Sequence, residues 1–229
     1  METGARALYD TRAAVVAHPY GLLIGFRIEE PSPTASVLDR DGIVFQDNDV
    51  EFFIDFGWGY YEFEINAAGT IYEVMHVWRD SFSQSPFAQD PSWCITNPHV
   101  FTFAGDFDRR PQSFWEGTHP RGVRIAHRAY DFPGLEARVH VDGVLNDPSQ
   151  PSAGWTAEVL LPWAELSRLS GGALQFPLHN QSVSMFLGRF QHIHVGSTQH
   201  TAAWCVSPHG ILDTHQPERF TKVHFGPGE

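Results

Sequence analysis

Residues 47–55 and 60–66 have the alternation of a β-hairpin with one apolar face and one acidic face. Because residues two apart in a strand share a face, Val50, Phe52 and Ile54 are expected to point the same way. The opposite faces of the two strands carry the polar set, which comprises Asp49, Glu51, Asp55, Glu62, Glu64 and Asn66. Carboxylates crowded on adjacent strands repel one another unless water, arginine, a cation or a polar ligand compensates them. The acidic face is therefore a candidate binding surface.

The length and composition fit one large all-β domain. The chain has 229 residues, of which 42% are hydrophobic and 14% aromatic, enough for a sizeable core. Its formal net charge of −12 disfavours nucleic acid and anionic membrane surfaces as partners. This balance suits a neutral, hydroxyl-rich ligand or a cation.

The ends of the chain and its cysteines bear on the expected compartment. No basic start followed by an apolar run precedes the first strand, and no stretch approaches the roughly 20 apolar residues of a membrane helix. With Met1 as the start, we expect a cytoplasmic protein. Cys94 and Cys205 lack metal-type spacing and are expected to be free thiols.

Further strands are expected along most of the chain, with one exception in the middle. They are predicted over 12–17, 22–29, 70–78, 123–129, 135–141, 155–161, 182–190 and 219–225, and residues 192–203 are ambiguous. Pro162 and Gly171 bracket one short helix. Residues 79–121 lack a period but are rich in aromatic side chains, so we expect an ordered excursion. The predicted fold is an all-β, antiparallel, jelly-roll-like β-sandwich over residues 1–229, with one short helix and a long aromatic loop excursion.

Three segments carry a resemblance to a known family. They are the hairpin with its following strand (47–55, 60–66 and 69–73), the strand and helix start at 155–163, and the closing stretch from Trp204 to Phe225. Together they resemble a family 9-like carbohydrate-binding module. The resemblance implies a β-sandwich that binds sugars, often as an accessory to glycoside hydrolases in carbohydrate catabolism. It does not by itself imply catalysis.

The resemblance and the chemistry of sugars suggest a ligand-binding set. Indole rings stack on the C–H faces of sugars, and the candidates are Trp58, Trp78, Trp93, Trp115 and Trp204. Of these the resemblance favours Trp78 and Trp204, whereas Trp155 and Trp163 look like core residues. Hydroxyl groups need both donors and acceptors. These are expected from Glu51, Asn66, Arg189, His209 and His215. The resemblance places Arg189 on the same face as the acidic strands, where it could also serve only as a structural ion-pair partner.

An enzyme is the alternative function. His192 and His194 would share one side of a strand, as in some transition-metal sites, and Asp213 or Glu218 could complete such a set. A lyase, isomerase or glycoside hydrolase acting on a sugar-like or other small metabolite would use histidine with Asp or Glu as acid and base. Its catalytic set would be Glu51, Glu64, His192 and His194. The separation of the carboxylates depends on the hairpin register, which the sequence leaves open.

The remaining expectations concern cofactors and partners. Asp47 and Asp49 offer hard oxygen ligands for calcium, or form a solvated turn, and no other cofactor is expected. The expected partner is a small sugar or glycoside, with no nucleic acid and no membrane. A purely structural or interaction protein, with the aromatic excursion as its partner surface, is a third possibility. Ligand identity and oligomeric state stay open.

Overall fold

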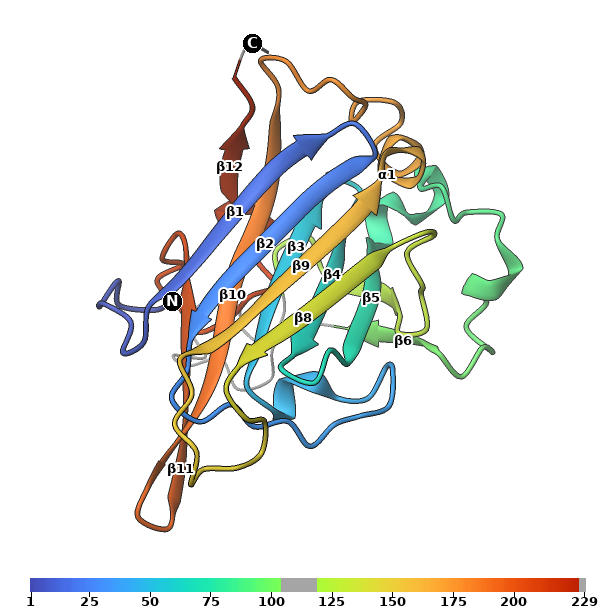
Figure 1. The fold of residues 1–229 in the computed structure, drawn as a ribbon. Helices are drawn as coiled ribbons and strands as arrows, with labels where there is room; N and C mark the ends of the chain where they lie inside the picture. The colour runs from blue at the N-terminus through green and yellow to red at the C-terminus, as the bar shows by residue number, and fades with distance from the viewer. Residues whose placement is uncertain (104–118, 227–229) are drawn as a thin grey trace.

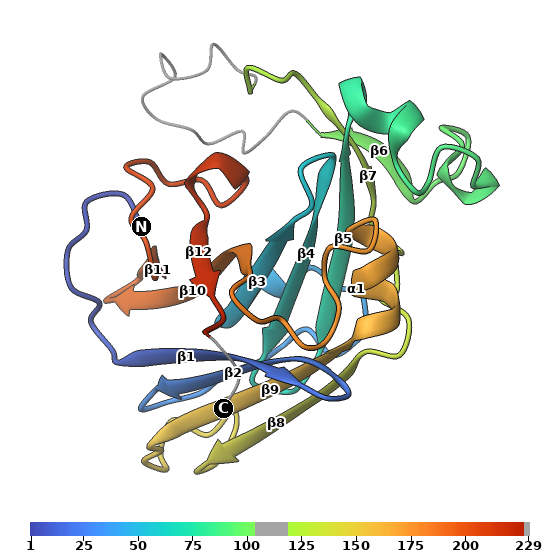
Figure 2. The ribbon, with the colours of Figure 1, turned by 90° about the horizontal axis from the view of Figure 1, so that it is seen from above.

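Two antiparallel β-sheets pack face to face in the computed structural model, which describes residues 1–103 and 119–226 except for the side chain of His194 (Figure 1). The smaller sheet has the order β1-β2-β9-β8. Its strands are β1 (Thr11–His18), β2 (Gly21–Glu29), β9 (Gly154–Pro162) and β8 (Glu136–Asp142). Figure 2 shows both sheets in profile, one above the other.

The larger sheet has eight strands in the order β11-β10-β3-β4-β5-β7-β6, with β12 paired to β10 outside this path. The strands nearest the predicted hairpin are β3 (Asp49–Asp55), β4 (Gly59–Asn66) and β5 (Ile71–Trp78). The others are β6 (Val100–Phe103), β7 (Arg124–His127), β10 (Ser182–Val195), β11 (Thr198–Cys205) and β12 (Thr221–His224). The predicted antiparallel β-sandwich is confirmed.

The hydrophobic core lies between the two sheets, as the alternation of the hairpin predicts. Val50, Phe52 and Ile54 of β3 are fully buried there against β2 and β9 residues such as Ile24 and Val159. Burying side chains of this size contributes about 1.5–3 kcal/mol each relative to leaving them exposed. The other face of the larger sheet packs against η1 (Val44–Gln46) and the segment 206–220, and we call it the loop face.

The hairpin register is fixed by the turn 56–59. Asp55 pairs with Tyr60 and Asp49 with Asn66, so Glu51 lies directly opposite Glu64. Gly57 adopts φ +80, a conformation that favours glycine, and its N–H donates to Asp55 Oδ1 at 2.8 Å. This register resolves the question that the sequence leaves open.

The one α-helix in the described part of the chain is α1 (Trp163–Leu169). It begins directly after Pro162, whose fixed φ suits a helix start, and it ends before Gly171, which has φ +61. Leu166 and Leu169 bury against the core. The short helix predicted from Pro162 and Gly171 is confirmed.

Part of the aromatic excursion is described and ordered. It contains η2 (Arg79–Gln84), η3 (Pro91–Trp93) and β6. The rings of Phe87 and Trp93 stack at 4.4 Å between centroids, and both are buried. The remaining aromatic residues of the excursion, which include Phe107, Phe114 and Trp115, lie outside the described residues.

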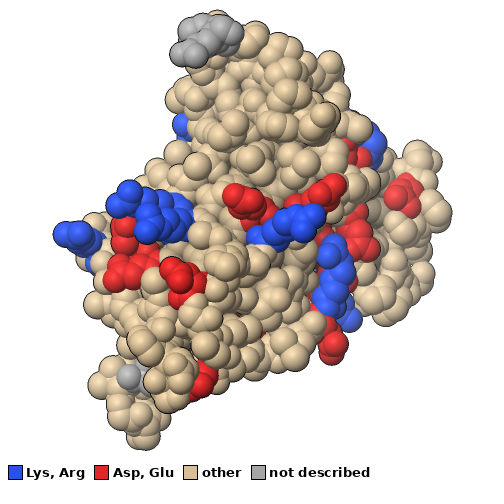
Figure 3. Space-filling view, in the orientation of Figure 1, with Lys and Arg blue, Asp and Glu red and all other residues tan. Residues whose placement is uncertain are grey.

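Acidic and basic side chains lie side by side on the face shown in Figure 3, which is the exposed side of the smaller sheet. Arg138 of β8 pairs across the strands with Glu158 of β9, and Arg12 forms an ion pair with Asp10 at 2.9 Å. The net negative charge is therefore not displayed here as one acidic patch. No helix in the described residues is both long enough and apolar enough to cross a bilayer.

Candidate functional site

Four carboxylates gather on the loop face of the larger sheet. Asp49 and Glu51 come from β3, and Glu62 and Glu64 come from β4, because alternate residues of these strands face away from the core. All four are at most 5% exposed. We call them the acidic cluster.

Because they are buried, these carboxyl groups keep their protons up to a higher pH than they would in water. Desolvation first, and then the neighbouring carboxylates, raise the pKa values of Asp49, Glu51 and Glu64 well above their usual range. Desolvation likewise raises the pKa of Glu62 to about 8. Buried carboxylate oxygens of Glu51 and Glu64 lack a hydrogen-bond partner. When ionised, the acidic cluster would therefore carry more negative charge than its surroundings balance.

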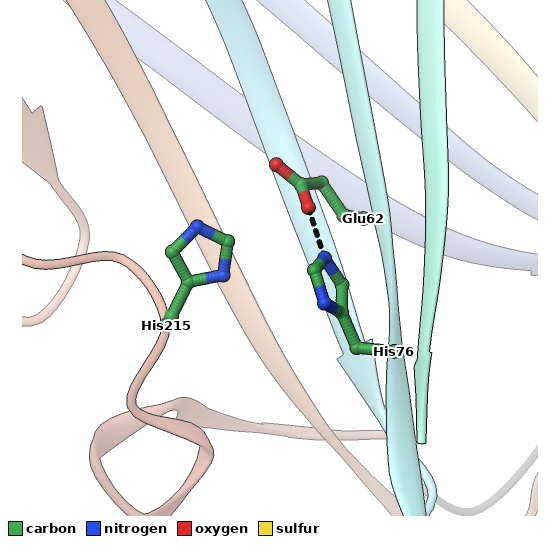
Figure 4. A group of neighbouring side chains, drawn as sticks. All are labelled: Glu62, His76 and His215. Atoms are coloured by element: carbon green, nitrogen blue, oxygen red, sulfur yellow. Dashed lines mark hydrogen bonds and ion pairs between the residues drawn. The ribbon is translucent and has the colours of Figure 1, made fainter. Parts of the chain in front are cut away.

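Two histidines meet the acidic cluster. His76 of β5 lies on the loop face, and its Nε2 is 2.5 Å from Glu62 Oε2. His215, from the C-terminal segment, points toward the same place (Figure 4). Burial, and then the charge of Arg124, lower the pKa of His76 well below its usual range, so its imidazole is neutral.

Arg124 of β7 is close enough for its positive charge to act on Glu62 and His76. It is fully buried, and its guanidinium carbon lies 4.3 Å from the ring centroid of Trp78 and 5.7 Å from that of Tyr60. Its Nη2 donates to the backbone oxygen of His215 at 2.6 Å. Arg124 therefore ties the C-terminal segment to the loop face.

Trp78, one of the two predicted stacking residues, is enclosed in this structure. It is 1% exposed, and besides Arg124 it contacts the guanidinium of Arg121 at 4.7 Å and the ring of His119 at 4.5 Å. A hollow of about 380 Å³ between Asp55 and Glu218 reaches the edge of this group. A sugar could stack on Trp78 only after these neighbours moved.

Arg189 lies on the opposite side of the sheet from the acidic cluster, so its predicted placement on the acidic face is wrong. It pairs across β3 with Val50, which faces the core, and its Nη1 donates to Thr11 Oγ1 at 2.9 Å and to the Glu29 backbone oxygen at 3.0 Å. Its Nη2 is 3.6 Å from Glu30 Oε2. The sequence around Arg189 is apolar on both faces of β10, so alternation could not decide which way it points.

Arg189 and Trp204 are brought together instead at a groove beside the N-terminal segment. The guanidinium carbon of Arg189 lies 5.4 Å from the Trp204 ring centroid and 5.7 Å from that of Tyr9. Both rings are half-buried. The hollow between residues 6–11 and strands β10 and β11 has a volume of about 310 Å³ and is also lined by Asp10 and Glu29.

A second hollow, of about 450 Å³, adjoins the first, since Tyr9 lines both. Its polar lining includes Glu30, Asn48, Gln191 and Gln199. His192 also lines it, and this ring interacts with Thr201 and Gln199 and with the Phe45 backbone oxygen. We call the two hollows together the edge groove.

Two other predicted ligand-binding residues, Asn66 and His209, form hydrogen bonds within the protein. Asn66 donates to the Val37 backbone oxygen and to Asp47, and its Oδ1 accepts from Ala68 and Thr70. His209 is buried, and its Nδ1 lies 2.9 Å from the backbone oxygen of Asp213. Asn66 lies next to the acidic cluster as the cross-strand partner of Asp49, but its amide is used by these bonds, and neither side chain lines the edge groove.

The two predicted calcium ligands have different surroundings. Asp47 accepts hydrogen bonds from Ser36, from the Val37 N–H and from Asn66, which satisfies both of its oxygens. Asp49 belongs to the acidic cluster and has the charge of Glu64 beside it. Calcium at this pair stays a prediction.

The predicted catalytic set is only partly assembled. Glu51 and Glu64 are cross-strand partners, but His192 lies four residues along β10 from Gly188, the residue opposite Glu51. At 3.3 Å per residue this is a separation of about 13 Å along the strand. The side chain of His194 lies outside the described part of the chain.

The residues of these sites that are absent from the sequence-based sets include His76, Arg124 and Tyr9. Alternation from Trp78 places His76 on the acidic face, so that signal was available in the sequence. Arg124 and Tyr9 carried no comparable signal, because each reaches its site through pairing of distant segments.

Comparison with known proteins gives two findings. Residues 10–88 match the family model described as carbohydrate-binding family 9, and this segment runs from β1 into the excursion after β5. A crystal structure of a Bacteroides uniformis ATCC 8492 protein, named a "putative carbohydrate-binding protein", superimposes with a TM-score of 0.52 at 16% identity, covering 95% of this chain and 78% of that one. No curated protein sequence matches the chain. The predicted resemblance to a family 9-like carbohydrate-binding module is confirmed.

Proposed function

We propose that this family 9-like β-sandwich binds a carbohydrate in the edge groove. The family match and the fold it shares with a protein named for carbohydrate binding support the class of ligand. The observation that carries the location is the meeting of Trp204, Tyr9 and Arg189 around one hollow. A role beside glycoside hydrolases in carbohydrate breakdown is part of the same proposal.

The groove has the chemistry that a sugar needs. Trp204 and Tyr9 offer half-buried ring surface for the C–H face of a pyranose. Asp10, Glu29 and Gln191 supply acceptors and donors for hydroxyl groups. Hollows of 310 and 450 Å³ are within the usual range for small-molecule sites, and together they suit a mono- or disaccharide.

The arrangement around Arg189 is rigid before any ligand arrives. Thr11, the Glu29 backbone and Gln191 all accept from its guanidinium. A preformed site of this kind loses little conformational entropy on binding. Arg189 therefore holds the wall of the groove, and the two aromatic rings provide most of the contact with the ligand.

The test is a glycan array followed by calorimetry on the sugars that bind. Trp204→Ala should weaken binding about 30-fold, which corresponds to about 2 kcal/mol for the loss of a central aromatic contact. Trp163→Ala is the matched control, because Trp163 is also half-buried but its Nε1 donates to the His18 backbone on the smaller sheet. Tyr9→Ala, in the N-terminal segment, gives a second variant with little risk to the fold.

Absence of any bound carbohydrate would contradict the proposal. So would a sugar that binds Trp204→Ala and Tyr9→Ala as tightly as the unmodified protein, because the edge groove would then not be its site.

A further inference from the structure

Three potential ligand side chains converge on the loop face, away from the edge groove. Glu62 comes from β4, His76 from β5 and His215 from the C-terminal segment. One ligand atom of each lies within 4.8 Å of the other two (Figure 4). Zinc binds imidazole nitrogen and carboxylate oxygen at about 2.0–2.2 Å, so a bound ion would draw these three ligand atoms closer together.

The three ligand groups favour some metal ions over others. Two imidazoles with one carboxylate suit zinc and iron(II), whereas magnesium and calcium prefer oxygen ligands alone. Three protein ligands also leave a coordination position for water or another small ligand.

The surrounding hydrogen bonds orient the two rings. The Tyr60 hydroxyl lies 3.0 Å from His215 Nδ1, and the Tyr60 ring stacks on His76 with centroids 4.6 Å apart. The backbone N–H of His215 donates to Asp213 Oδ1 at 2.9 Å. Metal-binding histidines are usually held by such outer contacts, which fix the direction of the ring.

Unpartnered polar atoms supply a second, independent observation. His76 is 2% exposed, and its Nδ1 has no hydrogen-bond partner. Oxygen atoms of Glu51 and Glu64 in the same cluster are also buried without a partner. Leaving such groups unsatisfied costs about 1–3 kcal/mol each, and more for charged groups, so an occupant is expected.

Charge balance points to a cation as that occupant. Of the four carboxyl groups, Glu62 has the positive charge of Arg124 nearby, whereas the charges acting on Asp49 and Glu51 come from other acidic groups. The guanidinium opposes a nearby cation, but a bound cation would favour the ionised form of the four carboxyl groups, which outnumber it. An ion also needs no cavity of its own, unlike a sugar.

We propose that Glu62, His76 and His215 bind one divalent transition-metal ion, zinc or iron(II), on the loop face. The ion would bridge β4, β5 and the C-terminal segment. This site is separate from the edge groove, so its success or failure is independent of carbohydrate binding.

The experiment uses the full chain, purified without a histidine tag, stripped with a chelator and titrated with Zn²⁺ alone. We expect one equivalent of bound zinc by elemental analysis and a dissociation constant at least about 100-fold weaker in His215→Ala. His200→Ala is the matched control, because His200 is an exposed histidine of β11. Tyr60→Phe should weaken binding about 10- to 100-fold through loss of the contact that orients His215.

A measurement on the unmodified protein tests the proposal even if a variant does not fold. Zn²⁺ should shift the imidazole nitrogen resonances of His76 and His215 in the NMR spectrum. Titration with Fe²⁺ under anaerobic conditions then distinguishes the two metals. Failure of both metals to bind stoichiometrically, or unchanged zinc affinity in His215→Ala, would overturn the proposal. So would zinc-induced shifts confined to His192 and His194.

Discussion

Two groups of buried charge lie on opposite faces of the larger sheet, and they differ in how completely they are paired. In the inter-sheet group, Glu30 accepts from Trp155 Nε1 at 2.7 Å and from Gln191 Nε2 at 3.2 Å, and it faces Arg189. Asn48 also donates to Glu30. The acidic cluster is buried as deeply, yet it gathers four carboxyl groups, of which Glu62 has Arg124 nearby, and it leaves oxygen atoms unpartnered.

The difference separates structural charge from charge that suits a ligand. A buried carboxylate such as Glu30, whose two oxygens both have partners, helps hold the two sheets together and has no free acceptor for a ligand. An excess of buried charge of one sign destabilises the folded protein. A bound counter-ion or ligand that compensates this charge removes the penalty. Burial of a charged group alone therefore does not indicate a ligand site. A cluster of buried carboxyl groups with unpartnered oxygens does.

The largest effect is expected at the inter-sheet group, where both oxygens of the buried carboxylate of Glu30 have partners. Replacing Arg189 with methionine leaves the carboxylate of Glu30 buried without its counter-charge and should lower the free energy of unfolding by about 3–5 kcal/mol. Urea denaturation measures this. Adding Glu30→Gln to the same chain should recover part of the loss. If Arg189→Met costs less than 1 kcal/mol, the inter-sheet pair is not the stabilising element described above.

The pH dependence of stability in the metal-free protein tests the acidic cluster. Raised pKa values, such as about 8 for Glu62, mean that the folded state holds protons that the unfolded state releases. Stability from this source is complete below about pH 4.5 and is lost as pH rises through the folded pKa values. The lowered pKa of His76 gives the opposite slope, but only below its usual value of 6.5. We therefore expect stability to fall by a few kcal/mol between pH 7 and 9.

Thermal unfolding across this range, with and without Zn²⁺, checks the expectation. Zinc should flatten the decline, because a bound cation stabilises the ionised carboxylates. Stability that rises from pH 7 to 9 in the stripped protein would contradict the assignment of excess negative charge to the loop face.

The smallest effect is a gain. Glu64→Gln removes one carboxylate from the acidic cluster at nearly constant volume and should raise the stability of the stripped protein by about 1–2 kcal/mol at pH 8.5. The gain should vanish near pH 5, where Glu64 is already protonated. Glu136→Gln, at an exposed position of β8, is the control and should change stability by less than about 0.5 kcal/mol. Destabilisation by Glu64→Gln at pH 8.5 would mean that this carboxylate is paired.

Local patterns allowed the β-hairpin, its two faces and the short helix to be predicted, because each depends on residues close together in sequence. Val50, Phe52 and Ile54 face the core as alternation requires, and Pro162 precedes α1. The antiparallel sandwich followed from the number and spacing of such segments.

The sites were harder to predict, because they depend on which distant strands become neighbours. Tyr9 and Trp204 line one hollow because each lies near Arg189 of β10, and Arg124 meets His215 across 91 residues of chain. The strand around Arg189 has large apolar residues on both faces, since both are covered, and so it has no alternation to read. His76 is the exception, because the period of two from Trp78 was sufficient to place it.

The position of β10 has a consequence for how the chain acquires its structure. This strand pairs with β3, β11 and β12, and β9 of the other sheet pairs with β2. Strands near the start of the chain therefore remain unpaired on one edge until residues 154–195 have left the ribosome. Folding dominated by contacts between such distant segments is slow, and exposed strand edges invite aggregation in the meantime. We expect truncation before β10 to leave a chain that depends on chaperones, even though the complete β3–β4–β5 meander is present in it.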